Sequence, residues 1–161
     1  MHSNVYEVST SPIPSQHYAR SGNLPDLFYE QICSYAENTD PLQRKQAIHE
    51  LARFLGPLCR CVGDQLTFGS DLKDSFFRKG YVCFRAAAEV LAQTAFSVFN
   101  GSEIAPAFDS ALTGLNDSYE DRYGVYIYTA DTGTLETLDH WLRHADLSQP
   151  VYIGGVVDYH R

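Results

Sequence analysis

The longest hydrophobic pattern in the chain runs from Asp71 to Phe99 and has the period of an α-helix. Apolar residues recur there at alternating steps of four and three, which return to one helical face at 3.6 residues per turn. This stripe comprises Phe77, Tyr81, Phe84, Ala88, Leu91, Ala95 and Val98, and a second set widens it: Phe76, Cys83, Ala87, Val90, Phe96 and Phe99. A helix that is apolar over so much of its circumference is buried by several neighbours. We therefore predict a long central helix, over about residues 71–99, as the core of the fold.

Helical spacing of apolar residues also predicts shorter helices elsewhere in the chain. These segments are Leu24–Asn38, Asp40–Leu55, Pro106–Leu115 and Leu135–Ala145. The clearest start is at Asp40, which can cap a helix, with Pro41 suited to the first helical position and Gln43 able to reach back from the third. The Gly56-Pro57 pair is a typical helix end. The sequence thus predicts three or four helices besides the central one.

Alternating or β-branched segments predict about four strands. These segments are Asn4–Thr10, Gln65–Phe68, Gly124–Thr129 and Val151–Tyr159. Two consecutive glycines, Gly154 and Gly155, lie inside the last strand and predict a bulge or a close backbone approach. Because strands and helices do not alternate strictly, we expect one α+β domain over residues 1–161, with a small, mostly antiparallel sheet packed on the central helix. The order of the strands and the oligomeric state do not follow from the sequence.

The charge of the chain is uneven and restricts the classes of partner. The net charge is −8, and 44% of the residues are hydrophobic, which is enough for a packed core. Residues 101–161 carry ten acidic and three basic side chains, a balance of −7, whereas residues 1–100 carry ten and nine. Nucleic acids and anionic lipids require cationic surface. We therefore expect neither as a partner, and a protein partner with a basic surface instead.

Candidate catalytic and metal-binding residues are few. His140 and His144 share a helical face but lack the glutamate of a zinc-protease motif, and the Cys59–Cys61 pair has no second ligand pair to complete a zinc site. We expect one of these two thiols to be buried and the other exposed. Glycine-rich phosphate-binding motifs are absent from the sequence. We therefore expect neither a metal nor a cofactor.

The function predicted from these patterns is non-catalytic binding. No cationic leader or apolar segment of membrane length is present, so we expect a cytoplasmic protein with reduced cysteines and no membrane contact. Tyrosine is favoured at interfaces, and the acidic C-terminal third is rich in it. The predicted protein-binding residues are Asp117, Tyr119, Glu120, Asp121, Tyr126, Tyr128, Asp131 and Glu136. One version is an inhibitor or immunity-type protein that masks a basic nucleic-acid-binding site. The alternative is a small enzyme or ligand-binding domain with a site between the strands and the central helix.

Overall fold

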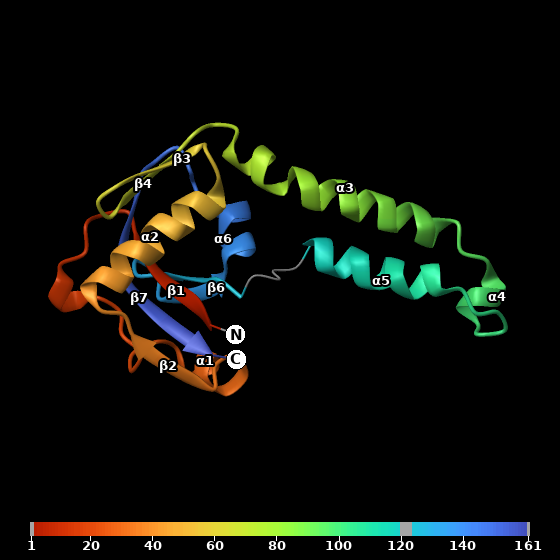
Figure 1. The fold of residues 1–161 in the computed structure, drawn as a ribbon, viewed down its shortest axis with the longest axis horizontal. Helices are drawn as coiled ribbons and strands as arrows, with labels where there is room; N and C mark the ends of the chain where they lie inside the picture. Colours follow the sequence, from red (N-terminus) through yellow and green to blue (C-terminus); the bar gives the residue numbers. More distant parts are fainter. Residues whose placement is uncertain (1, 120–123, 161) are drawn as a thin grey trace. The chain divides into compact units, whose positions relative to one another are not determined.

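The computed structural model describes residues 2–119 and 124–160 of the 161-residue chain (Figure 1). The chain divides into two compact units, residues 1–73 with 123–161 and residues 74–122. The first unit contains a mixed sheet with three α-helices, and the second contains helices. The predicted α+β class is confirmed, while the assignment of residues 1–161 to a single domain stays a prediction.

The sheet of the first unit has seven strands, so the prediction of about four strands was too low. The strands are β1 (His2–Ser9), β2 (Tyr35–Asn38), β3 (Cys59–Val62), β4 (Gln65–Phe68), β5 (Tyr126–Thr129), β6 (Thr134–Thr137) and β7 (Val151–His160). Their order is β3-β4-β7-β1-β5-β6, and β2 also pairs with β7. β1 and β5 are parallel, and the other pairs are antiparallel. The missed strands β2, β3 and β6 have four residues each, too few for a clear alternation.

The ten-residue strand β7 organises the sheet. β1 pairs with one edge of β7. The other edge of β7 pairs first with β4 and then with β2. Between these two partners the β1–β7 register shifts, as in a β-bulge, at the level of Gly154 and Gly155. A Cβ on Gly155 would collide with the backbone of Ala19, and a Cβ on Gly154 with the side chains of Glu7 and Ile13. The bulge and the close backbone approach predicted from the two glycines are thus confirmed.

The helices of the first unit are α1 (Asp26–Gln31), α2 (Pro41–Leu55) and α6 (Leu138–His144), with a short 3-10 turn η1 (Ser15–His17). The predicted start of α2 is confirmed, because the Asp40 carboxylate accepts hydrogen bonds from the backbone N–H of Leu42 and Gln43, and the Gln43 side chain accepts from the N–H of Asp40. The prediction of a helix over residues 24–38 was wrong beyond α1, because β2 occupies the last four of these residues. The helix predicted from Leu135 begins at Leu138, after β6, with Thr137 as its cap.

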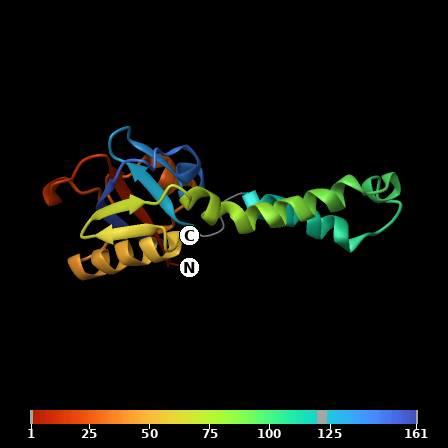
Figure 2. The ribbon, with the colours of Figure 1, turned by 90° about the horizontal axis from the view of Figure 1, so that it is seen from above.

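Apolar side chains cover both faces of the sheet. On one face Phe28 of α1, which is fully buried, packs its ring against Tyr126 and Tyr159 of the sheet, at centroid distances of 6.2 and 5.1 Å. On the other face α2 and α6 bring Ile48, Leu51, Leu138 and Leu142 into the core. Tyr6 belongs to this second face, since its hydroxyl donates to the backbone carbonyl of Ala47 in α2, 3.0 Å away. Figure 2 shows the sheet with α2 along it.

The second unit is a helical hairpin made of α3 (Leu72–Ala92), whose first two residues belong to the first unit, the short α4 (Phe96–Phe99) and α5 (Pro106–Tyr119). α3 and α5 lie side by side in both views (Figures 1 and 2). The prediction of one buried helix over residues 71–99 was wrong in two respects. The helix ends at Ala92, and of its 21 residues, all of them described, Leu72 alone is buried. Phe84 and Leu91, in the middle of the predicted core stripe, are half-buried.

Candidate functional site

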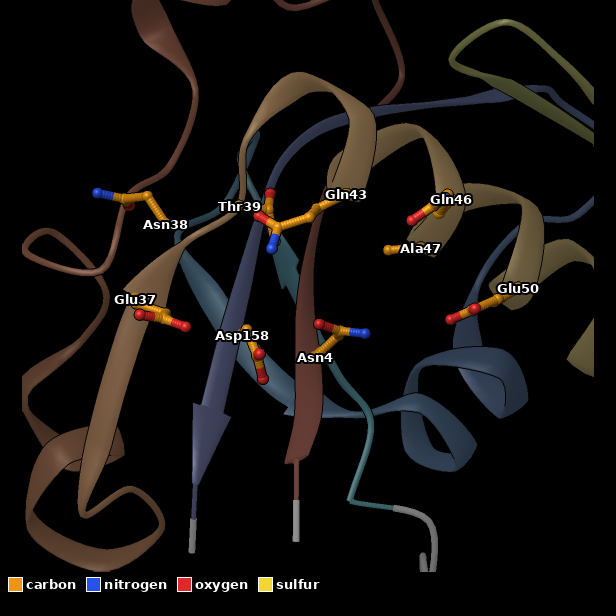
Figure 3. Close-up of a pocket in the computed structure, with 9 residues that line it drawn as sticks. All are labelled: Asn4, Glu37, Asn38, Thr39, Gln43, Gln46, Ala47, Glu50 and Asp158. Carbon is orange, nitrogen blue, oxygen red and sulfur yellow. The ribbon is translucent and has the colours of Figure 1, made fainter.

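A polar pocket of about 160 Å³ lies in the first unit, between α2 and three adjacent strands (Figure 3). The described residues that line it are Asn4, Glu37, Asn38, Thr39, Gln43, Gln46, Ala47, Glu50 and Asp158. We call it the acidic pocket, because three of these side chains are carboxylates and no lysine, arginine or histidine is among them.

The strand side of the acidic pocket is a row of polar residues in register. Glu37 of β2 pairs with Asp158 of β7, and Asp158 pairs with Asn4 of β1. Residues that are directly opposite in a sheet project from the same face, and Figure 3 shows the three side chains next to one another. Two residues further along β1 and β7 on this face, Tyr6 and Val156 are buried. The surface below α2 therefore changes from apolar to polar at this row.

The helix side of the acidic pocket is a polar stripe on α2. Gln43, Gln46 and Glu50 are spaced by three and four residues, so they share one side of the helix. This stripe adjoins the buried face of α2 at Ala47. Because the capping box of α2 fixes the helix start at Asp40, it also fixes which turn of α2 faces the row of Asn4, Asp158 and Glu37. The pocket is thus positioned by regular elements on both sides.

The described side chains of the acidic pocket concentrate negative charge. Like charges that are directly opposite in a sheet are destabilising, and Glu37 lies opposite Asp158. Glu37 also accepts a hydrogen bond of 3.3 Å from the Tyr35 hydroxyl. Behind the pocket, burial raises the pKa of Tyr6 far above its ordinary value, so its phenol stays protonated and bonded to α2. A lysine or arginine side chain entering here would reduce the repulsion between the carboxylates.

A second polar pocket, of about 180 Å³, lies beside the gap between β4 and β2 and shares Asn38 and Thr39 with the acidic pocket. Two arginines, Arg20 and Arg44, line this second pocket, and the Arg44 side chain is already engaged. The guanidinium donates to the carbonyls of Ile153 and Gly154, each at 2.6 Å, forms an ion pair of 2.9 Å with Asp64, and lies 4.5 Å from the centre of the Tyr18 ring. Arg44 thus replaces the strand partner that β7 lacks at its bulge, which is a structural role.

The buried carboxylate of Glu7 holds the same bulge from the opposite face of the sheet. One oxygen of Glu7 accepts hydrogen bonds from the backbone N–H of Gly155, at 2.6 Å, and of Ala19, at 2.7 Å. Glu7 is 4% exposed, and a buried charge requires such partners. Its hydrogen bonds tie the segment before α1 to β7. We therefore assign Glu7 to the fold and not to the binding site.

The predicted protein-binding residues of the first unit have mixed surroundings. Tyr126 is buried in the core beside Phe28, and Tyr128 is partly buried against the same cluster. Asp131 is exposed and accepts hydrogen bonds from Ser9 and Thr10. The Glu136 carboxylate contacts the Nδ1 atom of His140. These four residues therefore also contribute to packing and to local polar contacts within the unit.

The other four predicted residues are not in the described part of the first unit. Asp117 and Tyr119 lie on α5 of the second unit, where Tyr119 is 58% exposed. Glu120 and Asp121 lie outside the described residues. The structure thus assigns the predicted binding residues to two different units, and whether they form a protein-binding surface stays a prediction.

The histidine and cysteine candidates show no reactive or metal-binding arrangement. Residues 2–119 and 124–160 contain no group of three or more His, Cys, Asp or Glu side chains that could hold a metal ion. Cys59 and Cys61 are both half-buried on one face of β3, so the prediction of one buried and one exposed thiol was wrong. Residues two apart in a strand share a face. Burial, and secondarily the Cys61 thiol, raises the pKa of Cys59 to about 11, which disfavours the thiolate.

Sequence reasoning did not find the acidic pocket. The available signal was modest: Asn4 and Asp158 interrupt two apolar strands, and Gln43, Gln46 and Glu50 share one helical side. Glu37 could not have been recognised, because residues 24–38 were predicted to be a helix. Strand order was also needed, since only the β2-β7-β1 register brings Glu37, Asp158 and Asn4 together.

Comparison with known proteins adds no functional information. No protein-family model matches the chain, and neither a curated protein nor a solved structure is significantly similar to it. Within the described residues, no helix combines the length and the apolar character needed to cross a membrane.

Proposed function

We propose that the protein is a non-catalytic binding protein for a protein partner with a basic surface, and that its acidic pocket receives a lysine or arginine side chain of that partner. The observation that carries the proposal is the concentration of three carboxylates in the pocket, whose lining within the described residues includes no lysine, arginine or histidine. The net charge of −8 supports it further, because complementary charge steers a basic partner towards an acidic one.

The size of the acidic pocket favours a single side chain over a whole small molecule. Its volume of about 160 Å³ is below the range of about 300–1,000 Å³ that is usual for small-molecule sites. The lining offers carboxylates, carboxamides and one threonine hydroxyl, and the Thr39 hydroxyl donates to the carbonyl of Val156. Among the described residues of the lining there is no histidine or cysteine for acid–base or nucleophilic chemistry. Binding is therefore the function that this geometry supports best.

One specific form of this function is an inhibitor or immunity-type protein that masks a basic nucleic-acid-binding site. The acidic pocket would then accept one anchoring cation, while the remaining surface charge sets the association rate. The predicted residues of the acidic C-terminal third, with Asp131 exposed in the first unit, would contribute to the same long-range attraction. This form is expected in the cytoplasm, without a cofactor.

A titration with basic peptides tests the proposal. Oligo-lysine and oligo-arginine peptides are titrated into the wild type and into a triple variant, Glu37→Gln, Glu50→Gln and Asp158→Asn. We expect the variant to bind these peptides at least about tenfold more weakly than the wild type. In the wild type, the chemical-shift changes on binding should be centred on Asn4, Gln43 and Gln46. A matched control neutralises three exposed carboxylates elsewhere: Glu30→Gln, Asp71→Asn and Glu89→Gln. Equal weakening in both triple variants would contradict the pocket, because only net charge would then matter.

A further inference from the structure

A second row of polar residues lies beside the row of Asn4, Asp158 and Glu37 in the acidic pocket, towards the end of β7. In this second row, His160 of β7 pairs with Tyr35 of β2. Residues two apart in a strand share a face, so His160 lies on the face of Asp158, and Tyr35 on the face of Glu37. The His160 side chain is half-buried. A histidine is therefore positioned next to two carboxylates of the pocket.

Tyr35 connects this histidine with the acidic pocket. The ring of Tyr35 lies beside the imidazole of His160, with the ring centres 6.2 Å apart, and its hydroxyl donates to the Glu37 carboxylate at 3.3 Å. The backbone carbonyl of His160 accepts hydrogen bonds from the N–H of Ser34, at 2.8 Å, and from its hydroxyl, at 3.2 Å. These contacts join the end of β7 to β2. The position of His160 relative to Glu37 is therefore set by the fold.

We propose that protonation of His160 weakens the binding of a basic side chain in the acidic pocket, so that partner binding depends on pH. This inference rests on the function proposed for the pocket and adds its regulation. A histidine ordinarily changes its charge between about pH 5 and 8, whereas carboxyl side chains ordinarily ionise near about pH 4. A change between about pH 5.5 and 7.5 therefore acts on a histidine and not on ordinary carboxylates.

The separation between His160 and Asp158 is short enough for this charge to act on the pocket. Residues two apart in a strand lie about 7 Å apart, within the roughly 8 Å over which charges interact at physiological salt. A protonated imidazole at this distance repels the lysine or arginine side chain that enters beside Asp158. We therefore expect binding to be about three- to tenfold weaker at pH 5.5 than at pH 7.5.

The other titratable groups around His160 are of two kinds. Carboxyl groups and phenols ordinarily titrate outside the range of about pH 5.5–7.5. Those on β7, β2 and α2 that border the pocket or His160 are Asp158, Glu37, Tyr35 and Glu50. Histidines form the second kind: His2 of β1 is opposite His160 in the sheet, and His49 precedes Glu50 on α2. Arg161, the next residue after His160, lies outside the described residues. The test must therefore separate His160 from the other two histidines.

Peptide titrations at two pH values test the inference. An oligo-lysine peptide, whose own charge is constant between about pH 5.5 and 7.5, is titrated into the wild type and into His160→Gln at low salt. Both proteins should bind equally at pH 7.5, and only the wild type should bind more weakly at pH 5.5. His160→Lys carries a permanent charge and should bind weakly at both pH values. Circular dichroism and the fluorescence of Trp141 should be the same in all variants.

The matched controls are His49→Gln, at an exposed position of α2, and His2→Gln. Both should retain the pH dependence of the wild type. Wild-type binding that is equal at the two pH values, or a pH dependence that persists in His160→Gln, would overturn the inference and leave the proposed function intact. A pH dependence that is lost entirely in either control would also overturn the role of His160. Absence of binding by the wild type at pH 7.5 would overturn the proposed function, and the inference with it.

Discussion

The two units of the chain differ in how far they bury their apolar residues. In the first unit, side chains such as Phe28, Leu138 and Tyr159 are completely buried between the sheet and its helices. In the described part of the second unit, Ala111 is the one buried apolar residue. Yet the apolar pattern of α3 is longer and more regular than that of α2. The difference shows that a helical stripe predicts an apolar surface but does not identify what covers it.

The same difference predicts where a core substitution has its largest effect. Phe28→Ala empties a fully buried site and should reduce the free energy of unfolding of the first unit by about 3–5 kcal/mol. That is a large part of a total of about 5–15 kcal/mol. The single tryptophan, Trp141 of α6, reports on this unit, so its fluorescence during urea unfolding measures the change.

The matched substitution in the second unit is Phe84→Ala. Phe84 is half-buried, so the expected loss is about 1 kcal/mol, and it should appear in the helical circular dichroism and not in the Trp141 transition. This loss is smaller than the loss expected if Phe84 were a fully buried core residue of α3. If Phe84→Ala shifted the urea midpoint measured by Trp141 fluorescence as far as Phe28→Ala does, the two units would unfold as one.

Thiol labelling sharpens the comparison between the units. Burial and the neighbouring Cys61 raise the pKa of Cys59 in the first unit from 9.0 to about 11, so its thiolate fraction at pH 8 falls by about 100-fold. Cys83 of the second unit is exposed on α3. Iodoacetamide labelling followed by peptide mass spectrometry should therefore modify Cys83 first. Equal rates at Cys59 and Cys83 would mean that β3 is not packed as described.

Local signals in the sequence predicted the parts of the fold that depend on neighbouring residues. The capping residues of α2 and the glycines of β7 were interpreted correctly, because each acts within a few residues of chain. The short strands β2 and β6 were predicted as parts of helices. Four residues hold too little alternation to identify a strand. β2 also depends on pairing with β7, which is distant in sequence, whereas β6 pairs with the neighbouring strand β5. Tertiary context overrides local propensity at such segments.

The acidic pocket depends on the same long-range information. Glu37 and Asp158 are separated by 120 residues, and only the pairing of β2 with β7 makes them neighbours. The overall charge did not indicate that Glu37, Glu50 and Asp158 line one pocket. The residues predicted from the acidic C-terminal third are near one another in sequence, and the structure distributes the described ones over both units. The class of partner inferred from composition stays a prediction, and the position of the pocket required the register of the sheet.

Two glycine substitutions provide a smaller test of the contrast between the units. Gly155→Ala places a methyl group against the backbone of Ala19, and such overpacking should cost about 1–3 kcal/mol. Gly114→Ala meets only an ordinary contact of 3.9 Å with Ala87, and should stabilise α5 by up to about 1 kcal/mol because alanine favours helix. Urea unfolding tests whether the first variant is destabilised and the second stabilised, with Trp141 fluorescence as the signal for Gly155→Ala and circular dichroism for Gly114→Ala. If Gly155→Ala left the free energy of unfolding unchanged, the backbone of Ala19 would not be closely packed against Gly155.

The smallest expected effect concerns the pH dependence of the first unit. The backbone N–H of Thr10, together with the hydroxyls of Ser9 and Thr10, lowers the pKa of Asp131 below its ordinary value of 3.8. These hydrogen bonds favour the charged carboxylate, so their contribution to stability is present above pH 4 and is lost as the pH falls through the lowered pKa. Because Asp131 is exposed, the contribution should be below about 1 kcal/mol. Asp131→Asn should therefore lower the Trp141 unfolding midpoint slightly at pH 7, and the difference from the wild type should diminish in acid, as the pH falls through the lowered pKa of Asp131. The control Glu89→Gln, on α3 of the second unit, should show no such difference at either pH. A difference that persists in acid would indicate that Asp131 acts through packing and not through its charge.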